Sequence, residues 1–264
     1  MSISETVEAL GTAIRVQSLA DGQLWRVWLN RPKGNVLDAE MVGALKEVFD
    51  RARTEQNLKL ITLEGEGKHF SFGASVEEHL PDQCAAMLSG FHAMFYRLHA
   101  SHVLCHAVVR GQCLGGGLEL ASFCHRVYAT PDSHHGQPEI ALGVIAPVAT
   151  VTLTSRVGRG AAEDLCLSGR VVDGQEALRM GLVDVLDEDP WGACQNYFEQ
   201  FIAARSASSL RFAVRAMRLE FGRDLERRVR ELEGLYNREL MTTHDAVEGI
   251  SAFVEKRKPE WRNE

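Results

Sequence analysis

Two glutamates, Glu119 and Glu139, are the residues of this chain whose type and spacing best suit chemistry. Consecutive glycines leave backbone amides open to a ligand and can adopt positive φ, so their N–H groups can point at a bound oxygen. A carboxylate just past such a turn, with a second one further along, suggests acid/base chemistry beside an oxyanion hole. The two segments are Gly111-Gln112-Cys113-Leu114-Gly115-Gly116-Gly117-Leu118-Glu119 and Gly136-Gln137-Pro138-Glu139-Ile140.

A purely structural explanation is also open for each glutamate. Glu119 follows a glycine turn and Glu139 follows a proline suited to the first position of a helix, where the helix dipole alone favours an acid. Taken singly, each glutamate is better explained as a first-turn stabiliser. The upstream segment 67–75 changes the balance, because it follows a strand-like run and offers small residues for a second backbone N–H donor. Two donors together with two carboxylates favour a reaction site.

The elements that must position these residues alternate between strands and helices. Alternating or continuous apolar runs predict strands, and Asp38 is placed to cap a helix whose apolar residues form one stripe. Such alternation implies crossover connections and a largely parallel sheet, so the fold class is α/β. The strands are expected at 24–29, 58–63, 103–109 and 126–129, and the helices after residue 38, over about 82–99 and through residue 123.

Beyond about residue 146 the pattern becomes helical throughout. The division that this predicts is an α/β core over residues 1–200 and a C-terminal helical region over 201–264, with no internal repeat or linker between them. A long amphipathic tail of this kind often packs on a partner subunit. The expected helices are 160–167, 174–180, 191–204 and 208–219, followed by a charge-rich helical stretch over 225–258.

Composition excludes several classes of function. The chain has 264 residues, of which 45% are hydrophobic and 25% charged, as expected of an ordinary globular protein. No stretch approaches the roughly 20 apolar residues of a membrane span, and the first residues lack the pattern of a secretory signal. The net charge of −7 disfavours nucleic-acid binding. We therefore expect a cytoplasmic protein.

The cysteines and histidines do not predict a metal site. The six cysteines are scattered without a C-x-x-C pair and are expected to be reduced core residues. His134 and His135 share a loop, and His102 and His106 flank or enter a strand, but neither pair has an acidic or cysteine partner at ligand spacing. The glycine run contains neither G-x-G-x-x-G nor G-K-[ST], which excludes a dinucleotide fold and a P-loop.

Several motifs, taken in order, resemble the crotonase superfamily of enoyl-CoA hydratases and isomerases, over about residues 24 to 261. The fold implied is the ClpP/crotonase-like spiral of ββα units with a C-terminal helical region. The motifs are Phe70-Ser71-Phe72-Gly73-Ala74, Gly115-Gly116-Gly117-Leu118-Glu119-Leu120, Gly136-Gln137-Pro138-Glu139-Ile140, Arg156-Val157-Gly158, Glu176-Ala177-Leu178-Arg179-Met180-Gly181-Leu182-Val183 and Ala252-Phe253-Val254-Glu255-Lys256-Arg257-Lys258-Pro259.

A narrower resemblance is to the cyclohexa-1,5-diene-1-carbonyl-CoA hydratases of anaerobic benzoyl-CoA degradation. Two departures separate the chain from the ordinary fatty-acyl pattern: Ser75 stands where an aspartate is usual, and a loop at 146–150 lacks the usual glycines. That loop borders the acyl pocket in the family. The segments similar to the subgroup include His69-Phe70-Ser71-Phe72-Gly73-Ala74-Ser75-Val76-Glu77-Glu78-His79 and His244-Asp245-Ala246-Val247-Glu248-Gly249.

The resemblance implies roles for individual residues. The amides of Ala74 and Gly116 would form the oxyanion hole for the thioester oxygen, and Glu119 and Glu139 would be the catalytic acid and base that hold the attacking water. No metal or other cofactor is implied, because coenzyme A is part of the substrate. The residues implied in binding coenzyme A are Arg31, Lys33, Asn35, Ala74, Phe253 and Lys256, with the last two from the chain itself or from a neighbouring subunit.

The partners that the resemblance implies are an acyl-CoA thioester and further copies of the chain, in a homotrimer or a dimer of trimers.

The same motifs also leave alternative functions open. A straight-chain enoyl-CoA hydratase or an enoyl-CoA isomerase of fatty-acid oxidation would carry similar motifs, although isomerases usually manage with one carboxylate. Some crotonase folds bind RNA, but the acidic net charge and the intact glutamate pair argue against that alternative.

Overall fold

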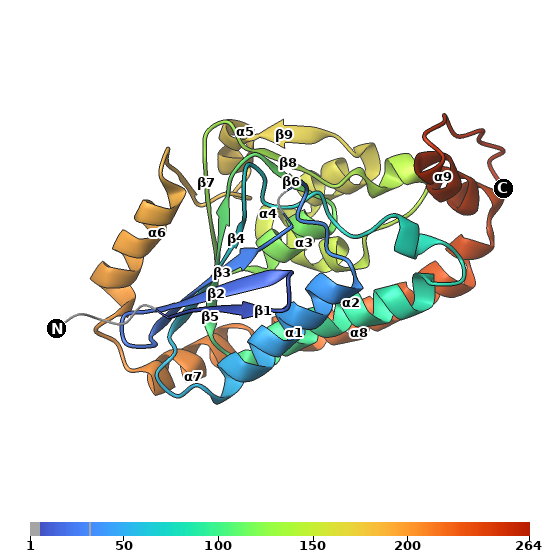
Figure 1. The fold of residues 1–264 in the computed structure, drawn as a ribbon. Helices are drawn as coiled ribbons and strands as arrows, with labels where there is room; N and C mark the ends of the chain where they lie inside the picture. The colour runs from blue at the N-terminus through green and yellow to red at the C-terminus, as the bar shows by residue number, and fades with distance from the viewer. Residues whose placement is uncertain (1–5, 32) are drawn as a thin grey trace.

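The computed structural model describes residues 6–31 and 33–264, and within them the main sheet has seven strands in the order β1-β2-β3-β4-β5-β7-β10 (Figure 1). The first three strands are antiparallel, and every pairing from β3 onward is parallel. The strands are β1 (Thr6–Leu10), β2 (Ile14–Leu19), β3 (Leu24–Leu29), β4 (Leu60–Gly65), β5 (Leu104–Val109), β7 (Arg126–Ala129) and β10 (Val185–Leu186).

A small second sheet brings the two glutamate segments together. Its strands are β6 (Gln112–Leu114), β8 (His134–Gly136) and β9 (Val171–Asp173). Strand β6 runs parallel to β8, with Leu114 opposite Gly136. The glycine turn that follows β6 and the segment that follows β8 therefore leave the same edge of this sheet as neighbours.

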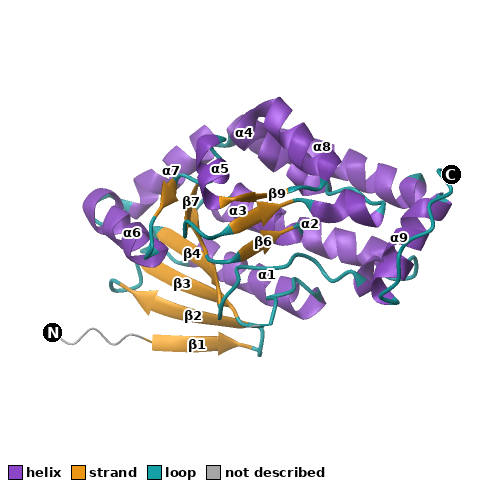
Figure 2. Ribbon diagram, turned by 90° about the horizontal axis from the view of Figure 1, so that it is seen from above, coloured by secondary structure: helices purple, strands orange, loops and turns teal. Residues whose placement is uncertain are grey.

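Helices cover both faces of the main sheet (Figure 2). On one side α1, α2 and α8 lie next to one another, as Figure 1 also shows. Helix α6 packs on the other side, against β5 and β7. The helices are α1 (Ala39–Thr54), α2 (Cys84–Ser101), α3 (Gly116–Phe123), α4 (Pro147–Ser168), α5 (Gly174–Arg179), α6 (Pro190–Tyr197), α7 (Ala207–Met217), α8 (Leu219–Arg238) and α9 (His244–Val254), with short 3₁₀ turns at Glu77–His79, Pro138–Leu142 and Leu240–Thr242 and a π turn at Phe198–Ile202.

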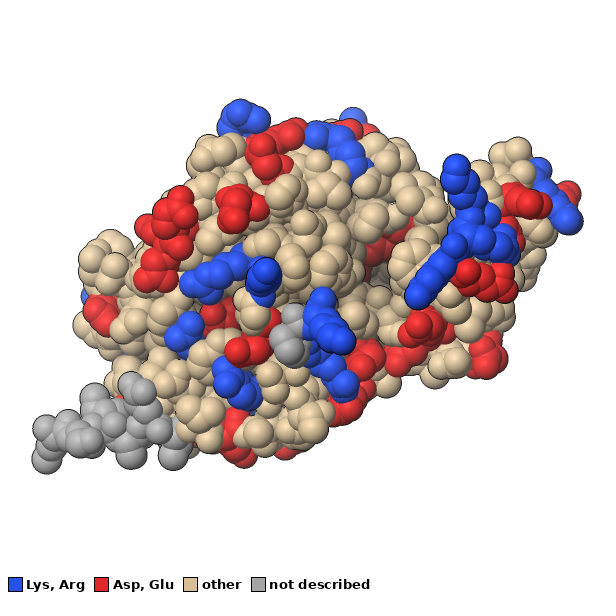
Figure 3. Space-filling view, turned by 45° about the horizontal axis from the view of Figure 1, so that its top comes forward, with Lys and Arg blue, Asp and Glu red and all other residues tan. Residues whose placement is uncertain are grey.

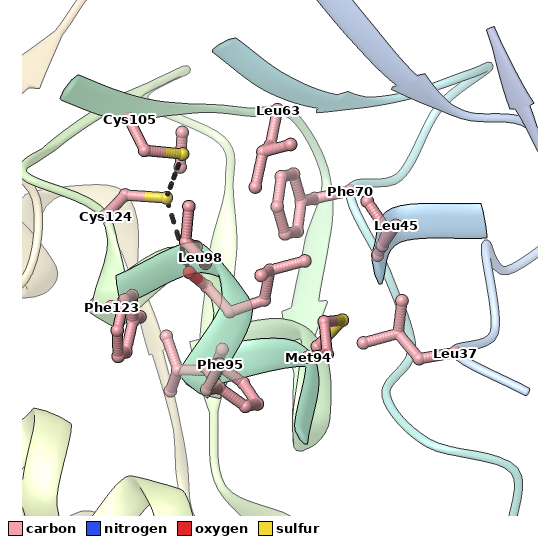
Figure 4. Packing of buried hydrophobic residues seen from close by; sticks show 14 of the residues in the cluster. Leu37, Leu45, Leu63, Phe70, Met94, Phe95, Leu98, Cys105, Phe123 and Cys124 are labelled. Carbon is pink, nitrogen blue, oxygen red and sulfur yellow. Dashed lines mark hydrogen bonds between the residues drawn. The ribbon is translucent and has the colours of Figure 1, made fainter. Parts of the chain in front are cut away.

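The main core fills the space between the sheet and helices α1 to α4. Phe70 and Phe95 are fully buried, and Phe95 meets the ring of Phe123 with 5.3 Å between ring centroids (Figure 4). Cys105 and Cys124 lie in the same core with their sulfur atoms 3.5 Å apart, and both are free thiols. This ring contact joins α2 to α3, which carries Glu119.

Most expected elements are present, and the fold expected from the motifs is confirmed. Asp38 caps α1, its side chain accepting a bond from the Met41 N–H at 2.9 Å. The strand expected at 58–63 lies two residues later, because β4 pairs with β3 in a register that begins at Leu24 and Leu60. The stretch expected at 225–258 is two helices, α8 and α9, separated by a 3₁₀ turn.

The largest error concerns α4. The expected helix, 160–167, is only its second half, since α4 begins at Pro147. Gly158 interrupts α4 with φ 77° and ψ 164°, a conformation that other residues rarely adopt. Similarly, the helix expected at 191–204 ends at Tyr197 and continues as the π turn.

Across the described residues, no helix is both long enough and apolar enough to cross a membrane.

Candidate active site

The backbone nitrogens of Ala74 and Gly116 lie near each other, although they belong to two different segments. Gly73, with φ 103°, turns the upstream segment so that it approaches α3 closely. A Cβ atom placed on Gly116 would lie 3.1 Å from the Ala74 nitrogen and 2.9 Å from the Phe91 ring, so only glycine leaves this space open. Gly116 is the first residue of α3, and its N–H therefore has no partner within the helix. The two expected donors are brought together.

Glu119 lies in the first turn of α3 and is 4% exposed. Its Oε1 atom accepts a hydrogen bond of 2.8 Å from the Ala149 N–H, in the first turn of α4. The positive end of the α4 dipole therefore points at this carboxyl group. Because one oxygen is held in this way, the orientation of the whole carboxyl group is fixed.

Glu139 lies in the 3₁₀ turn Pro138–Leu142, across the glycine turn from Glu119. Its Oε1 accepts a bond of 3.0 Å from the Gln137 side-chain amide. A Cβ atom on Gly115, which has φ 52°, would lie 2.7 Å from this same oxygen. Glycine at 115 thus lets the carboxyl group approach the turn, while the buried Oε2 has no hydrogen-bond partner among the described residues.

Burial raises the pKa of both glutamates. Loss of solvent is the main cause for Glu119 and for Glu139, and the charge of Glu139 raises the pKa of Glu119 further. The backbone N–H groups at the start of α4 oppose the shift at Glu119, and Gln137 opposes it at Glu139. Two carboxyl groups in these surroundings can hold a proton near neutral pH, as an acid/base pair requires.

Both glutamates and both amide segments line one cavity of about 420 Å³. Its other walls are mainly apolar and come from α2, from the start of α4 and from α9. Figure 3 shows a hollow between the main body and the C-terminal end of the molecule, with basic side chains on both sides of it. Besides the two glutamates and the two amide segments, the lining residues include Val76, Met87, Leu88, Phe91, Leu142, Val144, Ile145, Ala146, Pro147 and Phe253.

Arg31, Lys33 and Asn35, which are expected to bind coenzyme A, differ from one another in burial and in hydrogen-bond partners. Asn35 is fully buried, and its side chain bonds to the backbone of residues 31, 66 and 69, so it holds a turn together. Arg31 pairs with Glu40, and Lys33 is exposed. The Phe72 N–H bonds to the Gly34 carbonyl at 2.8 Å, which places this turn beside a residue of the cavity wall.

Phe253 and Lys256, the two C-terminal residues expected to bind coenzyme A, also differ in their surroundings: one lines the cavity and the other does not. Phe253, the penultimate residue of α9, lines the cavity of its own chain. Lys256 follows the helix with φ 56°, is exposed and lies outside the lining. Its contact with coenzyme A stays a prediction, as does that of Lys33.

The prediction of a loop at 146–150 is wrong, because residues 147–150 are helical. Pro147 occupies the first position of α4, where its fixed φ suits a helix start, and the segment is helical. Val148 is fully buried and does not line the cavity, whereas Ala146 and Pro147 do. Residues 147–150 therefore form a helix N-terminus against Glu119.

Sequence reasoning also missed residues that support the site. Gln137 stands two positions before Glu139, a spacing that could have indicated a bond between the two side chains. Ala149 and Phe91 carry no such signal, because a backbone donor and an apolar ring are recognised only after the elements pack.

The chain is similar to known proteins over most of its length. A family model described as Enoyl-CoA hydratase/isomerase matches residues 20–264. A protein of Thauera aromatica named cyclohexa-1,5-dienecarbonyl-CoA hydratase is 49% identical, over 92% of this chain and 94% of its own. The 2,3-dehydroadipyl-CoA hydratase of Escherichia coli is 32% identical, over 89% and 93%.

Solved structures show the same fold. An enoyl-CoA hydratase of Mycobacterium avium subsp. paratuberculosis superimposes with a TM-score of 0.82 at 22% identity, covering 95% of this chain and 99% of that one. One from Bacillus anthracis gives a TM-score of 0.74 at 26% identity, covering 96% and 100%. The chain therefore belongs to the enoyl-CoA hydratase/isomerase family, as an enzyme of the enoyl-CoA hydratase type.

Proposed function

We propose that this protein adds water to cyclohexa-1,5-diene-1-carbonyl-CoA to give 6-hydroxycyclohex-1-ene-1-carbonyl-CoA. The observation that carries the proposal is the pair of glutamates with raised pKa on one apolar cavity, beside the two convergent amides. The 49% identity to a relative named for this substrate supports the choice of a cyclic dienoyl group.

In this mechanism the thioester oxygen lies between the N–H groups of Ala74 and Gly116. Negative charge grows on that oxygen as water attacks the β-carbon, and donors fixed in advance stabilise the resulting enolate. Removing one such donor costs about 2.7–4 kcal/mol in other enzymes. Gly73 and Gly116 contribute by letting the two segments approach each other.

Glu119 and Glu139 hold the attacking water between them, and the ionised one of the two takes a proton from it. The attacking water gives one proton to whichever carboxyl group is ionised, and its oxygen bonds to the β-carbon. The bonds from Ala149 and Gln137 hold the two carboxyl groups in place, each through one oxygen. Coenzyme A enters as part of the substrate, and the proposal requires no other cofactor.

The cavity suits a compact acyl group. Ala146 and Pro147 present the rigid start of a helix to the cavity, and Phe253 of α9 adds an aromatic wall. A ring fills such a space without the entropy cost of ordering a flexible chain. The coenzyme A moiety would bind at the cavity mouth. It would contact the turn at residues 33–35 and the neighbouring residue Phe72.

We also propose self-association through the C-terminal helical region, as a homotrimer or a dimer of trimers in the cytoplasm. The family membership supports this proposal. The mass in solution, measured by light scattering at several concentrations, tests it, and a monomer at every concentration would contradict it.

The substrate is tested by comparing kcat/KM for the cyclic dienoyl thioester and for crotonyl-CoA. We expect the cyclic substrate to be preferred by at least about tenfold, which requires only ~1.4 kcal/mol. Equal or better activity on crotonyl-CoA would leave a straight-chain enoyl-CoA hydratase instead. Formation of a shifted double bond without a hydroxyl group would indicate an isomerase.

A further inference from the structure

His92 is a polar residue in an otherwise apolar wall of the cavity. It lies on α2 one turn beyond Leu88, and both side chains line the cavity together with the adjacent Phe91. His92 is 1% exposed, and its Nε2 atom is buried with no hydrogen-bond partner among the described residues. Such an atom is rare in a folded protein unless a ligand or a bound water completes it.

Glu233 of α8 fixes the orientation of this ring. Its Oε2 atom lies 2.6 Å from His92 Nδ1, and since a carboxylate only accepts hydrogen bonds, Nδ1 carries a proton. The bond lowers the pKa of Glu233, which therefore stays ionised and stabilises a positive charge on the ring. This arrangement leaves Nε2 as the ring nitrogen that still needs a hydrogen-bond partner.

The second histidine in the wall, His79, differs in its partner. Its Nδ1 donates to the Ser75 carbonyl at 2.7 Å. Burial lowers the pKa of His79, so this ring is neutral near neutral pH. Among the residues that the structure describes, a carboxylate pairs with His92 but not with His79.

The proposed substrate needs protons at two separate places. When water adds across the conjugated ring system, the hydroxyl group joins the β-carbon and the hydrogen joins the carbon at the opposite vertex of the ring. Glu119 and Glu139 both lie beside the glycine turn, at one side of the cavity. His92 and Leu88 belong to the wall that α2 forms.

We propose that His92, oriented by Glu233, donates the proton to the ring carbon opposite the new hydroxyl group; this inference rests on the proposed function. The attacking water loses a proton to an ionised glutamate as its oxygen bonds to the β-carbon, and the electron pair of that double bond enters the extended enolate. The opposite ring carbon then takes the Nε2 proton as the N–H bond breaks, and the remaining double bond forms between the thioester-bearing carbon and its other ring neighbour. The glutamate releases one proton to water and His92 regains one after product leaves, so protons balance.

Several charged or titratable groups lie on the elements packed near this ring or line the same cavity. Glu233 holds a carboxylate oxygen 2.6 Å from the ring, and Arg230 on the same helix lies near Glu233. The groups are Glu233 and Arg230 from α8, Tyr96 from α2, His79, Glu119 and Glu139.

The test compares His92→Gln and Glu233→Gln with the parent enzyme on the cyclic dienoyl thioester and on a linear enoyl thioester. Linear hydration protonates the α-carbon and does not need a donor at the opposite side of a ring. We expect His92→Gln to lower the ratio of cyclic to linear kcat/KM by about 10²-fold. His134→Gln, the same change at an exposed histidine of β8, is the matched control and should leave the ratio unchanged.

Glu233→Gln keeps an acceptor for Nδ1 but removes the negative charge. The alkaline limb of the rate profile on the cyclic substrate should therefore move to lower pH, while the profile on the linear substrate keeps its shape. Equal losses on both substrates with an unmoved limb would reduce His92 to a packing residue and overturn the proposal. A parent enzyme without activity on the cyclic thioester would overturn the proposed function itself, and the inference with it.

Discussion

Glu119 and Glu139 are held by different kinds of partner, but a glutamine substitution preserves both kinds of hydrogen bond. A backbone N–H of α4 holds Glu119, whereas the side chain of Gln137 holds Glu139. A glutamine at either position keeps an acceptor oxygen for these bonds and removes only the ability to exchange a proton. Loss of activity in such variants therefore reports on chemistry.

Glu119→Gln and Glu139→Gln should each lower the rate of hydration by about 10²–10⁴-fold, the usual contribution of a general acid or base. Binding of coenzyme A, measured by calorimetry, should stay near that of the parent protein. Glu163→Gln, an exposed residue of α4, provides the control and should retain full activity. Near-normal turnover in either catalytic variant would make that glutamate a first-turn stabiliser only.

The same two residues should make stability depend on pH. A carboxyl group whose pKa is raised by folding binds more protons in the folded than in the unfolded chain, so the free energy of unfolding falls as the pH rises above the ordinary glutamate value of 4.5. The neutral amide of Glu119→Gln does not incur this loss. Its Tm should therefore be close to that of the parent near pH ~4 and several degrees higher near pH ~8. An equal difference in Tm at both pH values would contradict the raised pKa.

At the scale of the element, Gly158 divides α4 into two helical segments. Its first turn delivers the Ala149 N–H to Glu119, and Gly158 then interrupts the helix. No atom lies within 4 Å of a Cβ built on Gly158 or on Gly160, so neither position is crowded. The two glycines differ in backbone conformation, because Gly158 alone has a positive φ, of 77°.

Gly158→Ala should therefore destabilise the protein by about 1–3 kcal/mol through backbone strain. Gly160→Ala, two residues later in regular helix, should be neutral or stabilise by up to about 1 kcal/mol. Urea denaturation of the two variants in parallel measures both effects. A similar stability for both would mean that the interruption at Gly158 is not maintained in solution.

At the scale of the whole molecule, the C-terminal helical region shares the core of the α/β part. Leu225 and Val229 of α8 are buried in the main hydrophobic cluster, and Glu233 reaches His92 on α2. A second cluster joins α2, α8 and α9 through Leu88, Tyr236 and Ile250. The division at residue 200 is therefore a change of architecture, and we expect it to carry no separate stability.

Leu225→Ala should lower the stability by about 2–5 kcal/mol, the usual cost of a buried leucine. Calorimetry should still show a single transition, since the affected helix and the sheet unfold together. Leu235→Ala on the same helix, at 40% exposure, should cost much less. A separate low-temperature transition in Leu225→Ala would show that the C-terminal region is an independent unit.

Local features of this protein can be predicted from its sequence. Asp38 predicted its helix because an N-cap bond needs only neighbours in the chain. The alternating residues at 24–29 predicted β3, and the continuous apolar run at 103–109 predicted β5, because burial on one face or on both faces of a sheet leaves a local pattern. The ordered motifs gave the family and the glycine turns that carry Glu119 and Glu139. Each of these signals lies within about ten residues.

Contacts between residues far apart in the chain complete the site, and these form only when the elements pack. Ala149 bonds to Glu119 across 30 positions, and Glu233 orients His92 across 141, so no local pattern can reveal either bond. The start of α4 carries no local signal, because its N-cap residue makes no side-chain hydrogen bond and its Ala149 N–H bonds to Glu119 of α3. Raised pKa values follow the same rule, since they depend on the solvent excluded from a carboxyl group, and only the packed molecule excludes it.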